Sequence, residues 1–359
     1  MKRKIWIIVG VIAITASLVL AFNKRREVAY DKPVVKIGAV FPLSGNMSNI
    51  GQALKGAIQV AIADANKNAD NRYRYVAIFE DSMLSLPMTA SITNKMISVD
   101  NVDALISFAA DVSNVVSGIA QSNQVIHFAI SVDTRAADGE YNFINWTMPD
   151  NSAAKMAELI HGKDFQNIAL IVFNQSGALA NTEALAGKLN VMNITNEIHK
   201  FNGDIRDFRT DIQKMREADL FVLRMFEPQI SIFIRQLREA GVTAPITSIE
   251  SFGWINDKSI IEGAWFVDVA DQDNDIIRRI KRHNRSDVNY GLGLVYDNVM
   301  LLVRAFESAD DRAGAAAELA KITKYEGSVG LLTQNEGGIF NSKPSMKIIK
   351  NGKAEVIKE

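Results

Sequence analysis

The chain has 359 residues, a length that suits two domains rather than one once a leader is set aside. Its formal net charge of −1 excludes a strong electrostatic attraction to nucleic acid. The sequence contains no cysteine, which excludes disulfides, thiol nucleophiles, zinc–thiolate sites and a lipid-modified cysteine.

The first 26 residues are typical of a membrane-targeting segment. Basic residues at positions 2–4 precede an apolar, uncharged run over Ile5–Phe22. Either cleavage after Ala21 removes this run, or the run stays as an anchor just long enough to span a bilayer. The basic residues 24–26 are unusual directly after a cleavage site. In both cases we expect the rest of the chain to be exported, to the periplasm or the outer face of the cytoplasmic membrane.

Strand-like and helix-like segments alternate after the leader. Apolar runs of strand length occur at Val34–Phe41, Tyr73–Phe79, Ala104–Phe108 and Val125–Ser131, and again at Asn167–Phe173, Ile194–Phe201, Leu220–Phe226, Pro245–Glu250 and Gly263–Val269. Amphipathic stretches such as Gly51–Asn66 and Pro228–Ala240 lie between them. The alternation predicts βαβ units with parallel sheets. A polar stretch around Pro149 and Asn151 interrupts the series, and we place a crossing between two lobes there.

The chemistry-bearing motifs of enzymes are missing from the sequence. It has four histidines, none at metal-ligand spacing, and His127 within the apolar run "VIHFAI" is interpreted as a core residue. There is no Gly-x-Ser-x-Gly elbow, no phosphate-binding loop and no Gly-x-Gly-x-x-Gly. We therefore predict a binding protein rather than an enzyme, with no metal and no cofactor.

The loop "FPLSGNMSNIGQ" is the first candidate for contact with a ligand. Pro42 ends the first apolar run, Gly45 permits a tight turn, and Asn49 with Gln52 resembles an N-cap pair that opens a helix. Ligands of open α/β sheets bind beyond the carboxyl ends of the strands, where this loop lies. An ordinary strand-to-helix connection is the alternative.

Several motifs in order resemble a known family. They are "KIGAVFPLSGNMSNIGQALKGAIQVAIADAN", "FEDSMLSLPMTASITNKMI", "APITSIESFGW", "GLGLVYDNVMLLVRAFESA" and "YEGSVGLLTQNEGGIF". The chain from Val34 to Glu359 thus resembles the type I periplasmic solute-binding proteins, in the leucine/isoleucine/valine-binding branch that serves ABC importers.

The resemblance implies an α/β fold of two Rossmann-like lobes with parallel central sheets. Three hinge crossovers would join the lobes, and closure about the hinge would bury a small solute. Lobe 1 would comprise residues 34–146 and 271–328, and lobe 2 residues 147–269 and 329–359.

The resemblance also implies candidate residues for the two ends of an amino acid. Glu250 falls where the family holds the ligand's ammonium group. The family binds the ligand's carboxylate with a serine, and at that place this chain has Asp111, which only accepts hydrogen bonds when ionised and would repel a carboxylate. Ser113, one register further along, is the alternative source of a hydroxyl. Asp111 is alternatively only the N-cap of a helix over Asp111–Gln121.

The next element of the family reads Ser-x-x-Ala-Thr, and here it is "SVDTRAAD". Asp133, Thr134 and Arg135 would then line the edge of the cleft. Thr134 is the natural hydrogen-bonding group, and Arg135 either binds a carboxylate as a fork or is an ordinary surface residue.

Four further residues complete the predicted site. Phe226 and Glu227 would lie in a second-lobe loop, Ile50 in the wall formed by the first loop, and Tyr296 near the cleft. The aromatic and apolar members are alternatively core residues. Together with Asp111, Asp133 and Glu250, Glu227 would make the pocket acidic unless Arg135 and Arg224 balance it.

The predicted function is a solute-binding subunit of an ABC importer, with a permease as partner and an amino acid or amide-like ligand. The alternative is a membrane-tethered sensor or assembly partner that uses the same scaffold without transport. Neither interpretation involves nucleic acid, and the membrane is a partner only if the N-terminal segment is retained.

Overall fold

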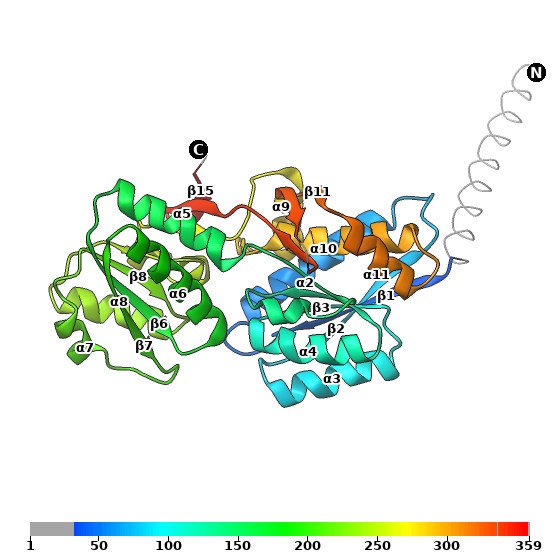
Figure 1. The fold of residues 1–359 in the computed structure, drawn as a ribbon, viewed down its shortest axis with the longest axis horizontal. Coiled ribbons are helices and arrows are strands. Elements are labelled where there is room, and N and C mark those ends of the chain that lie inside the picture. The colour runs from blue at the N-terminus through cyan, green and yellow to red at the C-terminus, as the bar shows by residue number, and fades with distance from the viewer. Residues whose placement is uncertain (1–31, 336, 358–359) are drawn as a thin grey trace, which may run out of the picture.

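The structure is a computed structural model that describes residues 32–335 and 337–357. The chain forms two lobes side by side (Figure 1). The predicted leader or anchor over residues 1–26 lies outside the described residues. Within the described part, no helix has both the length and the apolar character needed to cross a bilayer.

Lobe 1 is built on an eight-stranded sheet of order β11-β12-β13-β5-β4-β3-β1-β2. Its parallel strands are β1 (Val34–Phe41), β2 (Arg74–Asp81), β3 (Ala104–Phe108), β4 (Ile126–Ile130), β5 (Asn142–Trp146) and β13 (Ile339–Asn341). The antiparallel pairs add β11 (Lys324–Gly327) and β12 (Gly330–Gln334) at one edge.

Helices cover both faces of this sheet (Figure 1). They are α2 (Ser48–Ala65), α3 (Leu86–Ser98), α4 (Ala110–Ser122), α9 (Asp275–Asn284), α10 (Leu292–Glu307) and α11 (Arg312–Lys321), with a short 3-10 helix η1 at Thr134–Ala137. Every residue of β3, β4 and β5 is buried as a result. This explains why β3 and β4 read as nearly continuous apolar runs, whereas β5 also contains the buried Asn142 and Asn145.

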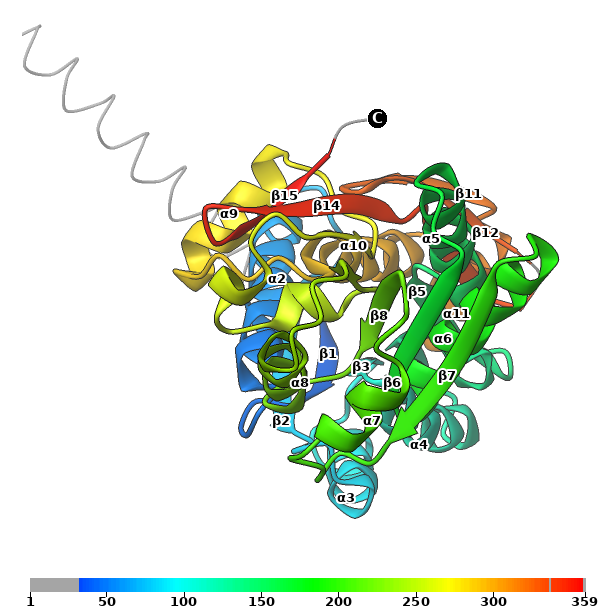
Figure 2. The same cartoon turned by 90° about the vertical axis from the view of Figure 1, so that its left-hand side faces the viewer.

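Lobe 2 contains a parallel sheet of order β7-β6-β8-β9 and an antiparallel sheet of order β10-β14-β15. The strands are β6 (Asn167–Phe173), β7 (Thr195–Phe201), β8 (Leu220–Arg224), β9 (Ile246–Thr247), β10 (Trp265–Asp268), β14 (Ser345–Lys350) and β15 (Lys353–Val356). A parallel bridge between Ile249 and Val267 joins the two sheets. Figure 2 shows this lobe in front, with its strands seen beside the helices that flank them.

The helices of lobe 2 are α5 (Pro149–Gly162), α6 (Ser176–Val191), α7 (Arg209–Lys214) and α8 (Gln229–Glu239), with 3-10 helices η2 (Ser251–Trp254) and η3 (Lys258–Ile261). Apolar residues of α5 and α6 pack in one core cluster with those of β6 and β8, whereas α8 belongs to a second cluster. Two layers of helices therefore enclose the sheet, as the predicted βαβ units require.

Three crossovers connect the lobes, which confirms the predicted architecture. The chain crosses after β5, after β10 and after β13, and the crossovers hydrogen-bond to one another. The hydroxyls of Thr147 and Ser342 lie 2.7 Å apart, and the Ala270 amide donates to Thr147 Oγ1 at 2.9 Å. The Ser345 hydroxyl donates to the Val269 carbonyl at 2.7 Å.

The last crossing lies later in the chain than the predicted boundary at 328/329. Strands β12 and β13 follow this boundary, yet β12 pairs with β13 and β13 pairs in parallel with β5 of lobe 1. Gly337 and Gly338 adopt φ values of 97° and 73°, which lets the chain turn onto the free edge of β5. Strands β12 and β13 therefore belong to the lobe 1 sheet, and the crossing follows Asn341.

The hinge holds a buried group of charges. Lys347 is 1% exposed, and its ammonium lies 2.8 Å from a carboxylate oxygen of Asp268 and 2.8 Å from one of Asp271. The same ammonium donates to the Asn289 carbonyl of lobe 1 at 3.3 Å. Burial alone would lower the pKa of Lys347, but the two carboxylates raise it, so the lysine stays charged.

Candidate functional site

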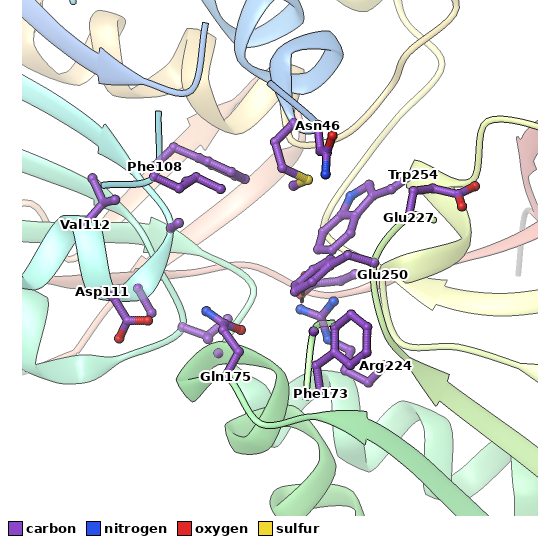
Figure 3. A pocket seen from close by; sticks show the side chains of 18 of the residues that line it. Asn46, Phe108, Asp111, Val112, Phe173, Gln175, Arg224, Glu227, Glu250 and Trp254 are labelled. Carbon is purple, nitrogen blue, oxygen red and sulfur yellow. Dashed lines mark hydrogen bonds and ion pairs between the residues drawn. The ribbon is translucent and has the colours of Figure 1, made fainter. Parts of the chain in front are cut away.

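A cavity of about 720 Å³ lies between the two lobes. Figure 3 shows Asn46, Phe108 and Asp111 of lobe 1 facing Phe173, Arg224 and Trp254 of lobe 2. The lobe 1 wall comes from the β1–α2 loop, the start of α4, the end of β4, Trp146 and Tyr290. The lobe 2 wall comes from the loops that follow β6, β7, β8 and β9. The cavity thus lies at the carboxyl ends of both parallel sheets, where ligands of open α/β sheets bind.

The start of helix α4 presents unpaired amide groups to this cavity. The first backbone hydrogen bond of the helix runs from Ser113 N to Ala109 O, at 2.8 Å. The preceding amides of Ala110, Asp111 and Val112 therefore have no acceptor within the helix, and all three residues line the cavity. Such N–H groups, together with the helix dipole, favour an anionic group.

Aromatic side chains from both lobes form the wall near the hinge. Trp254 stacks on Phe226, with ring centroids 4.9 Å apart and an interplanar angle of 18°. Tyr290 of lobe 1 meets Trp254 edge-on at 4.9 Å and Trp146 at 5.2 Å. Phe108 lies 6.4 Å from Tyr290 in a similar edge contact. These flat, rigid surfaces suit a ligand with an apolar or aromatic body.

A buried ion pair stands behind the aromatic wall. Arg224 ends the fully buried strand β8 and is 5% exposed, and Glu250 is 1% exposed. An Arg224 nitrogen donates to Glu250 Oε2 at 2.9 Å, and a second nitrogen donates to Ser251 Oγ at 3.1 Å. The Tyr290 hydroxyl donates to the same Glu250 oxygen at 2.7 Å. Because Tyr290 belongs to lobe 1, this bond joins the lobes deep in the cleft.

Glu250 has an unusual backbone conformation for a residue with a side chain. Its φ is 66°, in the left-handed region, which is strained outside glycine and asparagine. Its amide donates to Val267 O at 2.7 Å, and its carbonyl accepts from Gly253 N at 3.0 Å. Burial raises the pKa of Tyr290 well above its ordinary value, and the adjacent Glu250 carboxylate adds to this shift. The tyrosine is therefore a hydrogen-bond donor at any physiological pH.

Three buried polar atoms of this wall have no hydrogen-bond partner within the described part of the chain. They are Arg224 Nε, Glu250 Oε1 and Trp254 Nε1, and all three residues line the cavity. Buried polar groups are normally paired, so an unpaired set in the residues that border one cavity marks this wall as a candidate site for ligand contact.

Four of the predicted site residues line the cavity: Asp111, Phe226, Glu227 and Glu250. Asp111 lies in the first turn of α4 rather than at its N-cap, which is Ala109. Its carboxylate accepts from the Ser176 hydroxyl of lobe 2 at 2.8 Å, and so it ties the lobes together at the mouth of the cleft.

Glu227 has local partners at the far side of the cavity. Its Oε1 accepts from the Ser231 hydroxyl at 2.8 Å and from the Asn256 amide at 3.0 Å. These bonds fix the loop that carries Phe226.

The other six predicted residues do not line the cavity. They are Ser113, Asp133, Thr134, Arg135, Ile50 and Tyr296. Asp133 accepts from Arg135 at 3.0 Å and from Asn114 at 2.8 Å, and the Arg135 side chain is 70% exposed. Thr134 is exposed at the start of η1. Asp133 and Arg135 thus pair with each other and do not contribute charge to the cavity.

Ser113, Ile50 and Tyr296 point elsewhere in lobe 1. Ser113 is fully buried, and its hydroxyl lies 2.8 Å from that of Ser107, which contacts His127 Nε2 at 2.7 Å. Ile50 packs in the core, and the Tyr296 hydroxyl donates to Asp64 at 3.1 Å. His127 is a fully buried core histidine as predicted, and burial lowers its pKa to about 4.

Sequence reasoning missed most of the aromatic wall. Trp254 sits four residues after Glu250 in the quoted "SIESFGW", and Tyr290 directly precedes the glycine of "GLGLVY". Trp146 and Phe108 end buried strands of lobe 1. A search for aromatic residues at strand ends would have found Trp146 and Phe108, whereas Trp254 ends η2 and Tyr290 lies between α9 and α10.

A two-lobed α/β protein with three crossovers and an interlobe cavity belongs to the class that closes around a small solute. A family model described as "periplasmic binding protein" matches residues 34–343. The match spans most of the chain, which therefore belongs to the periplasmic binding protein family, and the resemblance noted in the sequence is confirmed. No curated protein matches the chain.

Solved structures share this fold. A leucine binding protein, LivK, from Thermotoga maritima is 19% identical, with 90% of this chain and 98% of that chain covered and a TM-score of 0.80. LivJ from Streptococcus pneumoniae, in complex with isoleucine, is 18% identical, with 91% and 100% covered and a TM-score of 0.77. A solute binding protein of an ABC transporter from R. palustris, in complex with 4-hydroxybenzoate, is 14% identical, with 91% and 96% covered and a TM-score of 0.78.

Proposed function

We propose that this chain is an extracytoplasmic solute-binding protein that closes its lobes around a small carboxylic acid and delivers it to an ABC importer. The observation that carries the proposal is the unpaired set of Arg224 Nε, Glu250 Oε1 and Trp254 Nε1 beside one interlobe cavity. The free amides at the start of α4 supply a place for the acid group on the opposite lobe.

The ligand class draws support from the solutes named with the similar structures. Isoleucine is named with one neighbour and 4-hydroxybenzoate with another, and both are small acids with an apolar body. The aromatic wall suits such a body. The cavity of about 720 Å³ is in the range of small-molecule sites.

Export and a permease partner complete the proposal. The apolar run over residues 5–22 supports export, and the similar structures named as binding proteins of ABC transporters support a permease partner. No part of the proposal calls for a chemical transformation of the solute. Within the described residues no cluster of three or more His, Asp or Glu side chains could hold a metal ion.

The test is isothermal titration calorimetry on the full-length chain in detergent micelles. The panel contains branched-chain and aromatic amino acids, benzoates, amides and polyamines. Saturable one-to-one binding of a small acid, with uptake of the same acid lost from cells that lack the gene, supports the proposal. Binding without any uptake phenotype would favour a sensor, and cooperative unfolding without binding of any compound would refute a solute-binding role.

A further inference from the structure

The position between the Trp254 ring and the Glu250 carboxylate already holds a cation. The guanidinium carbon of Arg224 lies 4.9 Å from the centroid of Trp254 and 5.8 Å from that of Phe226. The same guanidinium donates to Glu250 at 2.9 Å and to Ser251 at 3.1 Å. An aromatic face beside a carboxylate is a favourable place for a ligand's ammonium group, and here the protein's own arginine occupies it.

A ligand ammonium would compete with this arginine for a single carboxylate. Glu250 Oε2 accepts from both Arg224 and Tyr290, and only Oε1 is left. An ammonium placed at Oε1 would lie next to the guanidinium, at a carboxylate that is only 1% exposed. Two like charges beside one buried carboxylate are disfavoured, so the ion pair works against an amine-bearing ligand.

The groups left for a ligand are mostly donors. Among the unpaired groups of the wall and of the α4 start, these donors are Arg224 Nε, Trp254 Nε1 and three amides, against one acceptor oxygen of Glu250. The cavity is lined as well by Asp204 and Arg206, one charge of each sign. The Asp111 carboxylate does not cover the α4 amides, because it accepts from Ser176 and points away from the aromatic wall (Figure 3). Donors call for an acceptor-rich group such as a carboxylate, and the flat wall calls for a ring.

We propose that the ligand is a small ring-bearing carboxylate without an ammonium group, and that Arg224 is the residue that sets this preference. The inference rests on the proposed function and narrows its ligand class. It departs from the amino-acid ligand expected from the sequence, because the residue in the ammonium position, Glu250, already has a cation of its own.

Matched ligand pairs test the inference by calorimetry on the full-length chain. The pairs are 3-phenylpropionate with L-phenylalanine and 4-methylpentanoate with L-leucine, and benzoate is measured beside them. Each pair differs only in the α-ammonium group. We expect each deaminated acid to bind at least tenfold more tightly than its amino acid, and benzoate to bind as well.

The outcomes separate this inference from the proposed function. Tighter binding of the amino acids would overturn the inference and leave a solute-binding protein. No binding of either member of any pair, nor of the wider panel, would overturn both.

Substitutions test the role of Arg224 itself. In Arg224→Met the cation position is empty, and the preference should shift toward the amino acids by at least tenfold. Because this variant leaves Glu250 buried without its partner, the double variant Arg224→Met/Glu250→Gln is measured with it. In the double variant, the ratio of the amino acid's dissociation constant to that of its deaminated partner should also fall by at least tenfold. Arg135→Met, at an exposed arginine outside the cavity, is the matched control and should change nothing. An unchanged preference in the double variant would overturn the assignment to Arg224.

Discussion

Removal of the buried hinge cation tests the energetic reasoning most directly. Lys347 is 1% exposed and lies 2.8 Å from carboxylate oxygens of both Asp268 and Asp271. In Lys347→Met the two carboxylates stay buried without their cation. Loss of one partner of a buried pair costs about 3–5 kcal/mol, and we expect a loss of about 4 kcal/mol at pH 7.5.

The loss should shrink in acid. Burial raises the pKa of Asp268 to about 6 even with Lys347 beside it. Without the ammonium this pKa rises further, so Asp268 takes up a proton as the pH falls and the unpaired charge disappears. The variant should therefore lose less stability at pH 5 than at pH 7.5.

Urea unfolding followed by circular dichroism, at both pH values, measures these losses on the full-length chain. Lys353→Met is the matched control, because Lys353 is 65% exposed and its pair with Asp287 is at the surface. The control should change stability by no more than about 0.5 kcal/mol. A Lys347→Met variant as stable as this control at pH 7.5 would refute the reasoning.

The remaining predictions concern a buried carboxyl group, two glycines and the mouth of the cleft. Burial raises the pKa of Asp297 from 3.8 to about 7, so the folded state keeps a proton that the unfolded chain releases as the pH rises from about 4 to 7, and stability falls over this window. Relative to Asp297→Asn, the free energy of unfolding of the unaltered chain should fall by on the order of 3 kcal/mol between pH 5 and pH 8, measured by urea unfolding. Equal pH dependence of the two proteins would contradict a raised pKa of Asp297. Gly51→Ala should cost about 1–3 kcal/mol because its Cβ would overlap a carbonyl oxygen of the β1–α2 loop, whereas Gly118→Ala should add about 0.5–1 kcal/mol in α4, where nothing lies within 4 Å of the new atom. The same urea unfolding assay compares the two glycine variants, and equal changes in stability would contradict the close approach of the loop carbonyl to Gly51. Asp111→Ala and Ser176→Ala each remove the exposed bond at the cleft mouth, so stopped-flow binding should show a faster dissociation of ligand by a few-fold, with unfolding midpoints unchanged. Dissociation rates equal to that of the unaltered chain would mean that this bond does not hold the closed state.

The strands were predictable because parallel sheets bury both faces. Runs over Val34–Phe41, Ala104–Phe108 and Asn167–Phe173 match β1, β3 and β6 in their bounds. Weak amphipathic strands gave no comparable signal. In β12 only Leu332 is buried, and its neighbours alternate between exposed and partly exposed. The pairing of β13 with β5 and the packing of Leu332 and Phe340 in the lobe 1 core assign this segment to lobe 1, and such long-range contacts leave no local pattern in the sequence.

The sequence predicted correctly that residues after the ends of strands would line the cavity, but it did not predict the direction in which helical side chains point. Glu250 and Phe226 follow β9 and β8, and both reach the cavity. Ser113 lies on the same helix as Asp111 but on the face that packs into lobe 1. Side chains two residues apart on a helix point in different directions. The sequence alone therefore does not show which of Asp111 and Ser113 faces the cavity. Arg135 does not reach the cavity, because its guanidinium pairs with the carboxylate of Asp133, two residues earlier in the chain.

The hinge and the candidate site both contact the loop between α9 and α10 of lobe 1. The Asn289 carbonyl accepts from Lys347 of the hinge, and the next residue, Tyr290, donates to Glu250 in the site. Tyr290 also contacts Trp146 and Trp254, one from each lobe. A solute that enters beside Glu250 therefore touches a residue whose backbone neighbour is held by the hinge cation. Adjacent residues of this segment thus hold one contact to the hinge and one to the lobe 2 wall of the cavity, so a change in either contact acts on the same stretch of backbone.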